Sequence, residues 1–176
     1  MATGTLISVE EYLRTYYDPD MEYVDGQLVE RSVGQRRHSR LQSLLVMELG
    51  KREQERGFEV LAEQRIVTQP GRRYRVPDIC VKAVPDDPAP ILERPDLTIE
   101  ILSPDDTLME AAEKCAEYFQ SGIPANWVCD PYRKALYSYG PEGLRLVNPP
   151  ILENELTGPI DFAAIFAELD LSGKRR

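Results

Sequence analysis

The sequence predicts a mixed α/β (α+β) fold with a central mixed sheet flanked by helices, and three observations support this class. Two segments, one beginning near His38 and one between Thr107 and Gly122, carry apolar residues at helical spacing. Strand-length apolar stretches, separated by Gly, Pro and Asp, lie between and after them. A hairpin pattern over residues 22–30 precedes the first long helix as an N-terminal extension.

The N-terminal elements are predicted from capping and turn residues. Ser8 with Glu11 has the pattern of a capping box and indicates a short helix. Asp25-Gly26 is a strong signal for the tight turn of a β-hairpin. The long helix that follows begins near His38 and the segment ends at Gly57. Its apolar stripe is Leu41, Leu44, Leu45 and Leu49.

The middle of the chain is predicted to form three strands. We expect one strand over residues 58–67 and a second over 74–81, joined by a turn at Pro70-Gly71. A proline-rich loop over 85–95 then leads to a third strand. That strand covers residues 97–102 and is closed by the turn-forming residues 103–106.

The second half begins with a well-marked helix. Thr107 and Glu110 form a capping-box pattern, and Gly122 is placed to end the helix. Its expected apolar face is Ala111, Ala112, Cys115 and Phe119. The segments expected after it are strands over 126–129, 135–139 and 144–147, a turn at Asp130-Pro131, a helix over 162–169 and a low-order tail over 172–176.

Length and composition indicate one domain over residues 1–176, with a core over about 22–140 and a C-terminal extension over 141–176. A hydrophobic content of 42% and a charged content of 29% exclude wholesale disorder. The apolar runs are too short to span a bilayer, and the first ten residues lack the pattern of a signal peptide. We therefore expect no membrane partner and a cytoplasmic location.

The three cysteines, the single histidine and the net charge limit the kinds of active site that this chain can form. Cys80, Cys115 and Cys129 show no metal-ligand spacing and are expected to be reduced core thiols. His38 is the only histidine, which excludes a histidine-rich zinc site and argues against a Ser-His hydrolase. The net charge of -9 argues against a passive nucleic-acid coat. It leaves open a metal-dependent enzyme acting on nucleic acid, because bound cations reverse the local field.

Two acidic residues inside apolar stretches are the main functional signal. Asp78 lies in the stretch 75–81 and Glu100 in the stretch 97–102. A buried carboxylate costs several kcal/mol unless it is compensated. If the two strands are neighbours, both carboxylates can bind one Mg²⁺ or Mn²⁺, with the backbone carbonyl of Ile101 as a further ligand. The alternatives are ion pairs with an arginine such as Arg75 or Arg94, or an edge strand with its acid in solvent.

Lys114 lies on the helix after the Glu100 strand, on the flank of its apolar stripe. From there its ammonium group could reach over the sheet toward a phosphate or an attacking water. The alternative is a surface salt bridge to Glu110, four residues earlier, which stabilises a helix by only about 0.2–0.5 kcal/mol. The helical pattern alone does not separate these two interpretations.

Several short motifs occur in one order along the chain and together resemble a known family. They are Glu22-Tyr23-Val24-Asp25-Gly26, His38, Val76-Pro77-Asp78, Ile99-Glu100-Ile101-Leu102-Ser103-Pro104, Lys114 with Tyr118, Gly122-Ile123 and Trp127-Val128-Cys129-Asp130-Pro131. This set resembles the Uma-two family of candidate restriction endonucleases, a branch of the PD-(D/E)xK nuclease superfamily. The likeness spans roughly residues 22–137.

The resemblance implies a restriction-endonuclease-like core and Mg²⁺-dependent hydrolysis of phosphodiester bonds in nucleic acid, with DNA expected. Asp78 and Glu100 would be the metal ligands. The chain departs from the superfamily motif at Leu102, where a lysine is expected. We assign that role to Lys114, because the family places a lysine on the following helix, with Lys82 as the reserve candidate.

Two further positions and two further hypotheses stay open. His38 could orient a water or phosphate, or simply cap a helix. Glu63 could add an oxygen ligand, although a salt bridge to Arg65 or Arg73 competes with that role. A non-catalytic relative that binds nucleic acid or protein, or a plain α/β scaffold, would keep the fold without cleavage. A homodimer is expected, partly because the apolar segment 162–169 needs a covering surface.

Overall fold

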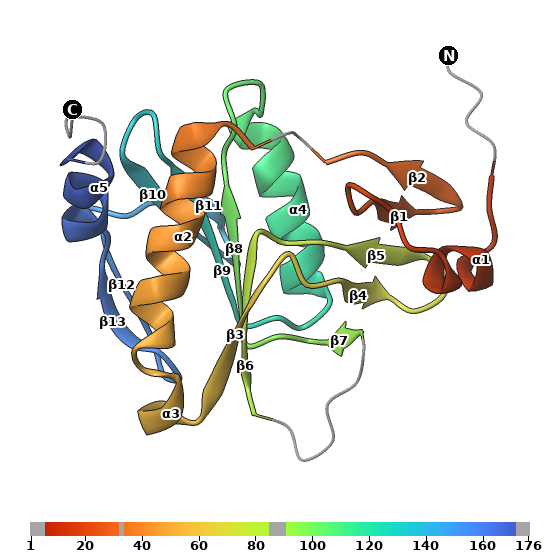
Figure 1. Ribbon diagram of the computed structural model, residues 1–176, viewed down its shortest axis with the longest axis horizontal. Coiled ribbons are helices and arrows are strands. Elements are labelled where there is room, and N and C mark those ends of the chain that lie inside the picture. Colours follow the sequence, from red (N-terminus) through yellow and green to blue (C-terminus); the bar gives the residue numbers. More distant parts are fainter. Residues whose placement is uncertain (1–5, 32–33, 85–90, 172–176) are drawn as a thin grey trace.

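A six-stranded mixed sheet forms the centre of the computed structural model, and a five-stranded sheet lies beside it (Figure 1). The structure describes residues 6–31, 34–84 and 91–171. The central sheet has the strand order β11-β10-β9-β8-β6-β3. Its strands are β3 (Phe58–Ala62), β6 (Ile79–Ala83), β8 (Leu97–Ile101), β9 (Ala125–Asp130), β10 (Ala135–Gly140) and β11 (Gly143–Leu146).

The second sheet has the order β2-β1-β5-β4-β7. Its strands are β1 (Glu22–Val24), β2 (Gln27–Val29), β4 (Ile66–Gln69), β5 (Arg73–Arg75) and β7 (Leu92–Glu93). The helices are α1 (Val9–Arg14), α2 (Arg36–Gly50), α3 (Glu53–Arg56), α4 (Leu108–Gln120) and α5 (Phe162–Leu171), and a small hairpin consists of β12 (Ile151–Asn154) and β13 (Gly158–Asp161). The predicted mixed α+β class is confirmed.

Strand β8 lies inside the central sheet and is buried along its whole length. It pairs antiparallel with β6 and parallel with β9, which makes the sheet mixed as predicted. Side chains alternate along β8, so Ile99 and Glu100 face opposite sides. Ile99 joins the core formed with α2 and α5, through residues such as Leu45 and Phe166. Glu100 therefore faces the other side, which α4 covers (Figure 1).

Two predicted strands are each divided between the two sheets, which corrects the sequence prediction. The segment 58–67 breaks into β3 and β4 at Glu63, whose φ is 53°. The segment 74–81 breaks into β5 and β6 around Pro77, which has no N–H group to donate to a strand ladder. Asp78 therefore lies at the junction of the two sheets rather than inside a strand. Glu100 lies within β8 as expected.

The helices follow the prediction with two differences. α2 ends at Gly50, and the short helix α3 intervenes before Gly57, which ends α3 with a φ of 72°. In α4 the Thr107–Glu110 capping box is present. Phe119, predicted for the inner face, is 38% exposed, whereas Tyr118 is fully buried. Tyr118 therefore occupies the inward position of that helical turn.

The N-terminal hairpin forms as predicted, with Asp25 and Gly26 at positive φ in its turn. Strand β1 also pairs with β5, so the hairpin is an integral part of the second sheet. Tyr12 of α1 packs with Tyr23 and Tyr74 in a small cluster that covers this sheet. The second sheet and α1 together form the right-hand part of Figure 1.

The C-terminal segment is part of the main core. Phe162 and Phe166 of α5 are buried in the same cluster as α2 and the central sheet. The covering surface that this segment needs is therefore supplied by the body of the chain, so the segment gives no argument for a homodimer. The tail over 172–176 and most of the proline-rich loop, residues 85–90, lie outside the described residues.

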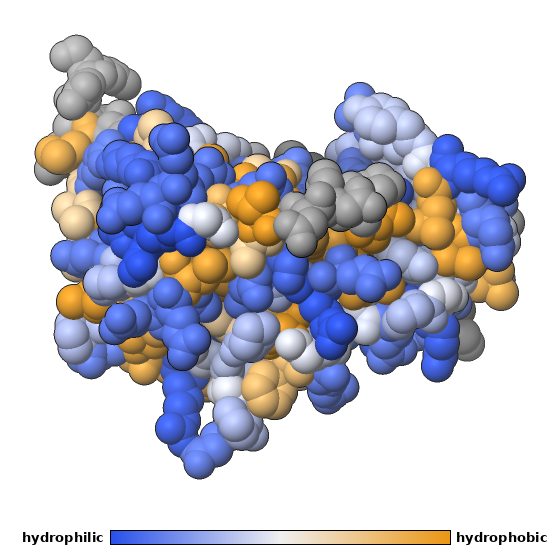
Figure 2. All heavy atoms as spheres, turned by 90° about the horizontal axis from the view of Figure 1, so that it is seen from below, coloured by the Kyte–Doolittle hydropathy of each residue, from blue (hydrophilic) through white to orange (hydrophobic). Residues whose placement is uncertain are grey.

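Over the described ranges, no helix combines the length and apolar character needed to cross a bilayer. On the face shown in Figure 2, apolar residues appear in separate patches among hydrophilic ones. The three cysteines are free and buried, as expected of core thiols.

Candidate active site

Asp78 and Glu100 meet on the side of the central sheet that faces α4. The antiparallel register pairs Ile79 with Ile99, and one further step places Asp78 opposite Glu100. The Ile101 N–H donates to Asp78 Oδ2 over 2.7 Å, which fixes this carboxylate at the strand end. Both acids line a cavity of about 560 Å³. Both carboxylates can bind one cation only if the strands after Asp78 and around Glu100 are neighbours. β6 and β8 pair with each other, so this requirement is fulfilled.

Asp78 is compensated by side chains from outside its own strand. Arg31 Nη2 donates to Asp78 Oδ1 over 2.9 Å, so the partner is neither of the arginines proposed from the sequence, Arg75 and Arg94. His38 Nε2 lies 3.3 Å from the same oxygen, and its Nδ1 lies 3.2 Å from Ser103 Oγ. Asp78 is thus held by one backbone donor and two basic side chains.

His38 is buried at the edge of the site, where the N-terminal turn of α2 approaches Asp78. Burial alone would lower the pKa of its imidazole, but the hydrogen bond and charge of Asp78 outweigh burial and raise the pKa. His38 is therefore a buried contact of Asp78, and it does not cap α2, whose N-cap residue is Gln35.

Glu100 has few partners for a buried carboxylate. Tyr118 Oη donates to Glu100 Oε1 over 2.6 Å, and Lys114 Nζ lies 3.8 Å from Oε2. Burial raises the pKa of Glu100 to about 7, against the opposing charge of Lys114. Asp78 raises it further, because two like charges face each other. Tyr118, named from the sequence only as part of the family motifs, is thus a direct contact of the candidate site.

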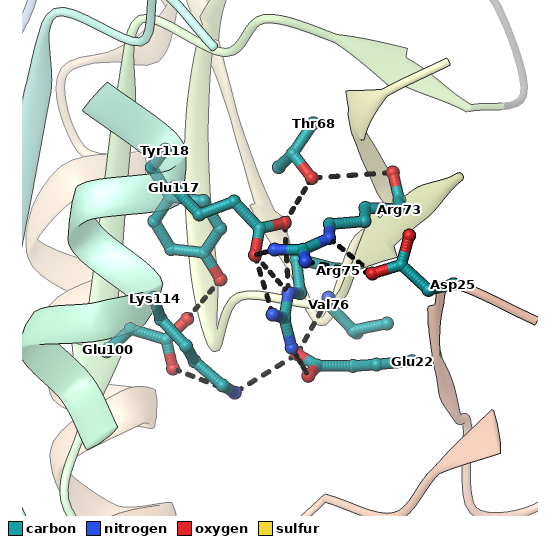
Figure 3. A network of polar contacts seen from close by, with 10 residues as sticks. All are labelled: Glu22, Asp25, Thr68, Arg73, Arg75, Val76, Glu100, Lys114, Glu117 and Tyr118. Atoms are coloured by element: carbon teal, nitrogen blue, oxygen red, sulfur yellow. Dashed lines mark hydrogen bonds and ion pairs between the residues drawn. The ribbon is translucent and has the colours of Figure 1, made fainter. Parts of the chain in front are cut away.

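Lys114 reaches the site instead of pairing with Glu110. Its ammonium group lies between Glu22 and Glu100, 3.0 Å from Glu22 Oε1 (Figure 3). Glu110 is bonded to Thr107 in the capping box. Burial would lower the pKa of Lys114, but Glu100 and Glu22 outweigh it and hold the pKa above its ordinary value. The lysine therefore carries its positive charge beside the carboxylate pair.

A second set of buried charges lies next to this site and joins α4 to the second sheet (Figure 3). Arg75 of β5 donates to Glu117 over 2.6 Å and to Glu22 over 2.9 Å. Glu117 also accepts from Arg73 and from the Thr68 hydroxyl. Burial would raise the pKa of Glu117, but the hydrogen bonds of Arg75 and Thr68 and the nearby positive charges lower it.

The two reserve candidates lie away from the centre of the site. Glu63 sits at the break between β3 and β4 with its side chain 53% exposed, and its partner is Arg31 at 3.7 Å rather than Arg65 or Arg73. Lys82 lies further along β6 and pairs with Asp96 at 3.4 Å. Neither side chain lines the cavity that contains Glu100.

Sequence reasoning missed three residues of the site. Tyr118 had a usable signal, because it lies four positions after Lys114 and so on the same face of the helix. Glu22 is 1% exposed, and its acidic character at the start of an apolar hairpin strand was the corresponding hint. Arg31 lies outside the helices and strands and carries no comparable signal.

The donor set fits a hard divalent cation that retains water. Mg²⁺ is commonly held by one or two protein carboxylates plus phosphate oxygens and waters. Asp78, at the junction just before β6, and Glu100, in the neighbouring β8, supply such a pair facing an open cavity. Within the described ranges, no group of three or more His, Cys, Asp or Glu side chains is arranged to hold a metal. A closed structural site of the zinc type is therefore not what these residues form.

Comparisons with known proteins bear on the family and on the fold of this chain. A family model described as "Putative restriction endonuclease", Uma2, matches residues 9–170. A solved structure titled as a putative nuclease belonging to DUF820, from Anabaena variabilis, superposes with a TM-score of 0.80 at 24% sequence identity. The match covers 93% of this chain and 99% of that one, and it bears on the fold. No curated protein matches this chain.

Proposed function

The chain belongs to the Uma2 family of "Putative restriction endonuclease" proteins, and from this premise we propose that it is a metal-dependent nuclease acting on phosphodiester bonds. The observation that carries the proposal is the pair formed by Asp78, just before β6, and Glu100 in the neighbouring β8, which Lys114 approaches in an open cavity. DNA is the nucleic acid we propose as substrate, and Mg²⁺ or Mn²⁺ as the cation.

Asp78 and Glu100 would hold the cation, with the carbonyl of Ile101 as the proposed third protein ligand. A bound Mg²⁺ supplies an activated water and neutralises charge on the phosphate. The N–H of Ile101 already fixes Asp78, so the adjacent carbonyl is carried by the same ordered backbone. The Tyr118 hydroxyl donates to Glu100 Oε1 and so holds the Glu100 carboxylate in place.

The superfamily motif has a lysine where this chain has Leu102. We propose that Lys114 takes the role of that lysine. Its ammonium group stays charged between Glu22 and Glu100, and it can donate to a phosphate oxygen that enters the cavity. A fixed cation beside the phosphate stabilises charge as the transition state forms, without reorganisation of solvent. His38 is a positioning residue here, because it contacts Asp78 and is itself held by Ser103.

The test is a calorimetric titration with Mn²⁺ of the wild type, Asp78→Asn and Glu100→Gln, combined with a cleavage assay on DNA. We expect both variants to lose Mn²⁺ binding and at least about 100-fold in cleavage rate, with unchanged circular dichroism. Glu113→Gln is the matched control, because Glu113 is exposed on α4 and lines the same cavity. Unaltered cleavage in both site variants would refute the proposal.

A non-catalytic binding role is the second candidate, and two observations favour it. Arg31 Nη2 already pairs with the Asp78 carboxylate over 2.9 Å, and Leu102 stands at the lysine position of the motif. Nucleic-acid binding by a wild type that takes up no Mn²⁺ and cleaves nothing would select this role.

A further inference from the structure

A second cavity, of about 860 Å³, lies on the other side of Asp78. Arg31, His38 and Asp78 line both this cavity and the one that contains Glu100. The two spaces therefore adjoin at the carboxylate proposed to bind the cation. A substrate whose phosphate sits at Asp78 has room for a neighbouring group on either side.

The walls of this second cavity carry the chemistry of a base-binding site. The segment between α1 and β1 forms one wall and presents Tyr16, whose ring is 88% exposed. Such an exposed aromatic ring has no packing role in the folded chain. Gln42 and Glu63 also line this cavity. The Gln42 amide nitrogen donates to the Asp78 carbonyl over 3.0 Å, and the Glu63 carboxylate, whose side chain is 53% exposed, lies 3.7 Å from Arg31.

Arg65 adds a fixed cation to the same cavity. Its guanidinium lies 4.3 Å from the centre of the Tyr12 ring and donates to Asp20 over 2.5 Å. Its Nε–H is buried and, among the residues described, has no hydrogen-bond acceptor. Orphaned buried donors are rare in folded proteins, so Arg65 keeps one donor that the described residues leave unused.

We infer that this second cavity, lined by Tyr16, Arg31, Gln42, Glu63 and Arg65, binds an unpaired nucleobase next to the cleaved phosphodiester. The inference rests on the proposed nuclease function and adds a substrate class, single-stranded or locally unpaired nucleic acid. An exposed tyrosine stacks on a base of any sequence. Arginine, amide and carboxylate groups around it provide donors and acceptors for the edge of the base.

The stacking contact requires a base that is not in a duplex. Inside a duplex both faces of a base are covered by its neighbours, so a side chain reaches a face only after the base leaves the stack. The net negative charge of the chain also favours a single strand over a duplex. A duplex carries about one phosphate charge per 1.7 Å of axis, twice the density of one strand, and the chain carries a net charge of -9.

The test is fluorescence anisotropy with a short labelled poly-thymidine strand and with the same strand in a duplex. Ca²⁺ is present as the cation, and the proteins are the wild type, Tyr16→Ala and Tyr16→Phe. We expect the single strand to bind more tightly than the duplex. Tyr16→Ala should lose roughly tenfold of the single-strand affinity, whereas Tyr16→Phe should retain it. Tyr132→Ala is the control, because Tyr132 is 39% exposed and lines neither cavity.

Two results would overturn the inference. Tighter binding of the duplex, or full single-strand affinity in Tyr16→Ala, would show that the second cavity does not hold an unpaired base. If Asp78→Asn still abolished cleavage in that case, the nuclease proposal would survive alone. A wild type that neither binds nor cleaves either DNA would remove both proposals together.

Discussion

Glu100 and Glu117 are buried to nearly the same extent, 8% and 7% exposed, yet their surroundings are opposite. Glu117 accepts hydrogen bonds from two arginines and a threonine, and its pKa is lowered despite burial. Glu100 has a single tyrosine donor and a lysine at 3.8 Å, and burial raises its pKa to about 7. Complete pairing marks a carboxylate that holds the fold, and incomplete pairing marks one available for a ligand.

Measuring the free energy of unfolding of variants is the most direct way to distinguish the roles of Glu100 and Glu117. Glu117→Gln leaves the buried charge of Arg75 with one carboxylate partner fewer, and we expect it to lower the free energy of unfolding by about 3 kcal/mol. Glu100→Gln removes a poorly compensated charge and should cause no loss of stability in the absence of metal. Urea denaturation of both variants measures the difference.

Glu113→Gln again serves as the control on α4, because its side chain is exposed and its expected change is near zero. Equal destabilisation by Glu100→Gln and Glu117→Gln would contradict the comparison, since both acids would then be structural.

Lys114 lies between the two regions, and its removal should affect chemistry more than metal binding. We expect Lys114→Met to lower the cleavage rate by about 100-fold, because a preorganised charge beside the phosphate is lost. The variant should retain its affinity for Mn²⁺, because the Lys114 ammonium group no longer competes with Mn²⁺ for the Glu100 carboxylate. The variant is compared with Lys82→Met, which removes a lysine that pairs with Asp96 outside the cavity. A larger loss of cleavage rate in Lys82→Met than in Lys114→Met would assign the role of the motif lysine to Lys82 instead.

Glu117 should contribute to the pH dependence of stability at acid pH. Its folded pKa lies below the unfolded value of 4.5, so its contribution is present above that value and is lost as the pH falls through the folded pKa. Over this acid window the stability gap between the wild type and Glu117→Gln should narrow, by at most about 1.4 kcal/mol per pH unit. Urea titrations at several acid pH values measure it, and a gap that widens toward low pH would show the sign to be wrong.

The sequence predicted the parts of the site that depend on local pattern. Glu100 follows from its place in an apolar strand, and the N-terminus of α4 follows from the Thr107–Glu110 capping box, which needs only four consecutive residues. Lys114 follows from its helical position together with the family resemblance. These features need no knowledge of which strands pair.

The remainder depends on contacts between distant segments. Arg31 lies 47 positions from Asp78, and nothing in its own neighbourhood indicates that partner. The division of 58–67 and 74–81 between two sheets brings β5, and with it Arg75, beside α4. Strand pairing of this kind is set by the whole fold, so the charged network could not be predicted from periodicity.

Tyr118 offers the smallest and most specific test of how Glu100 is kept available. Tyr118→Phe removes only the hydroxyl that donates to Glu100 Oε1. Partners that orient a metal ligand typically contribute 10- to 100-fold to affinity, and we expect a loss of about tenfold in Mn²⁺ affinity, measured by calorimetry. Tyr137→Phe, beside α4 in the same apolar cluster as Cys115, is the matched control and should bind as the wild type does. If Tyr118→Phe also bound normally, its hydroxyl would serve only to satisfy a buried acid, and Glu100 would resemble Glu117 more closely than its pairing indicates.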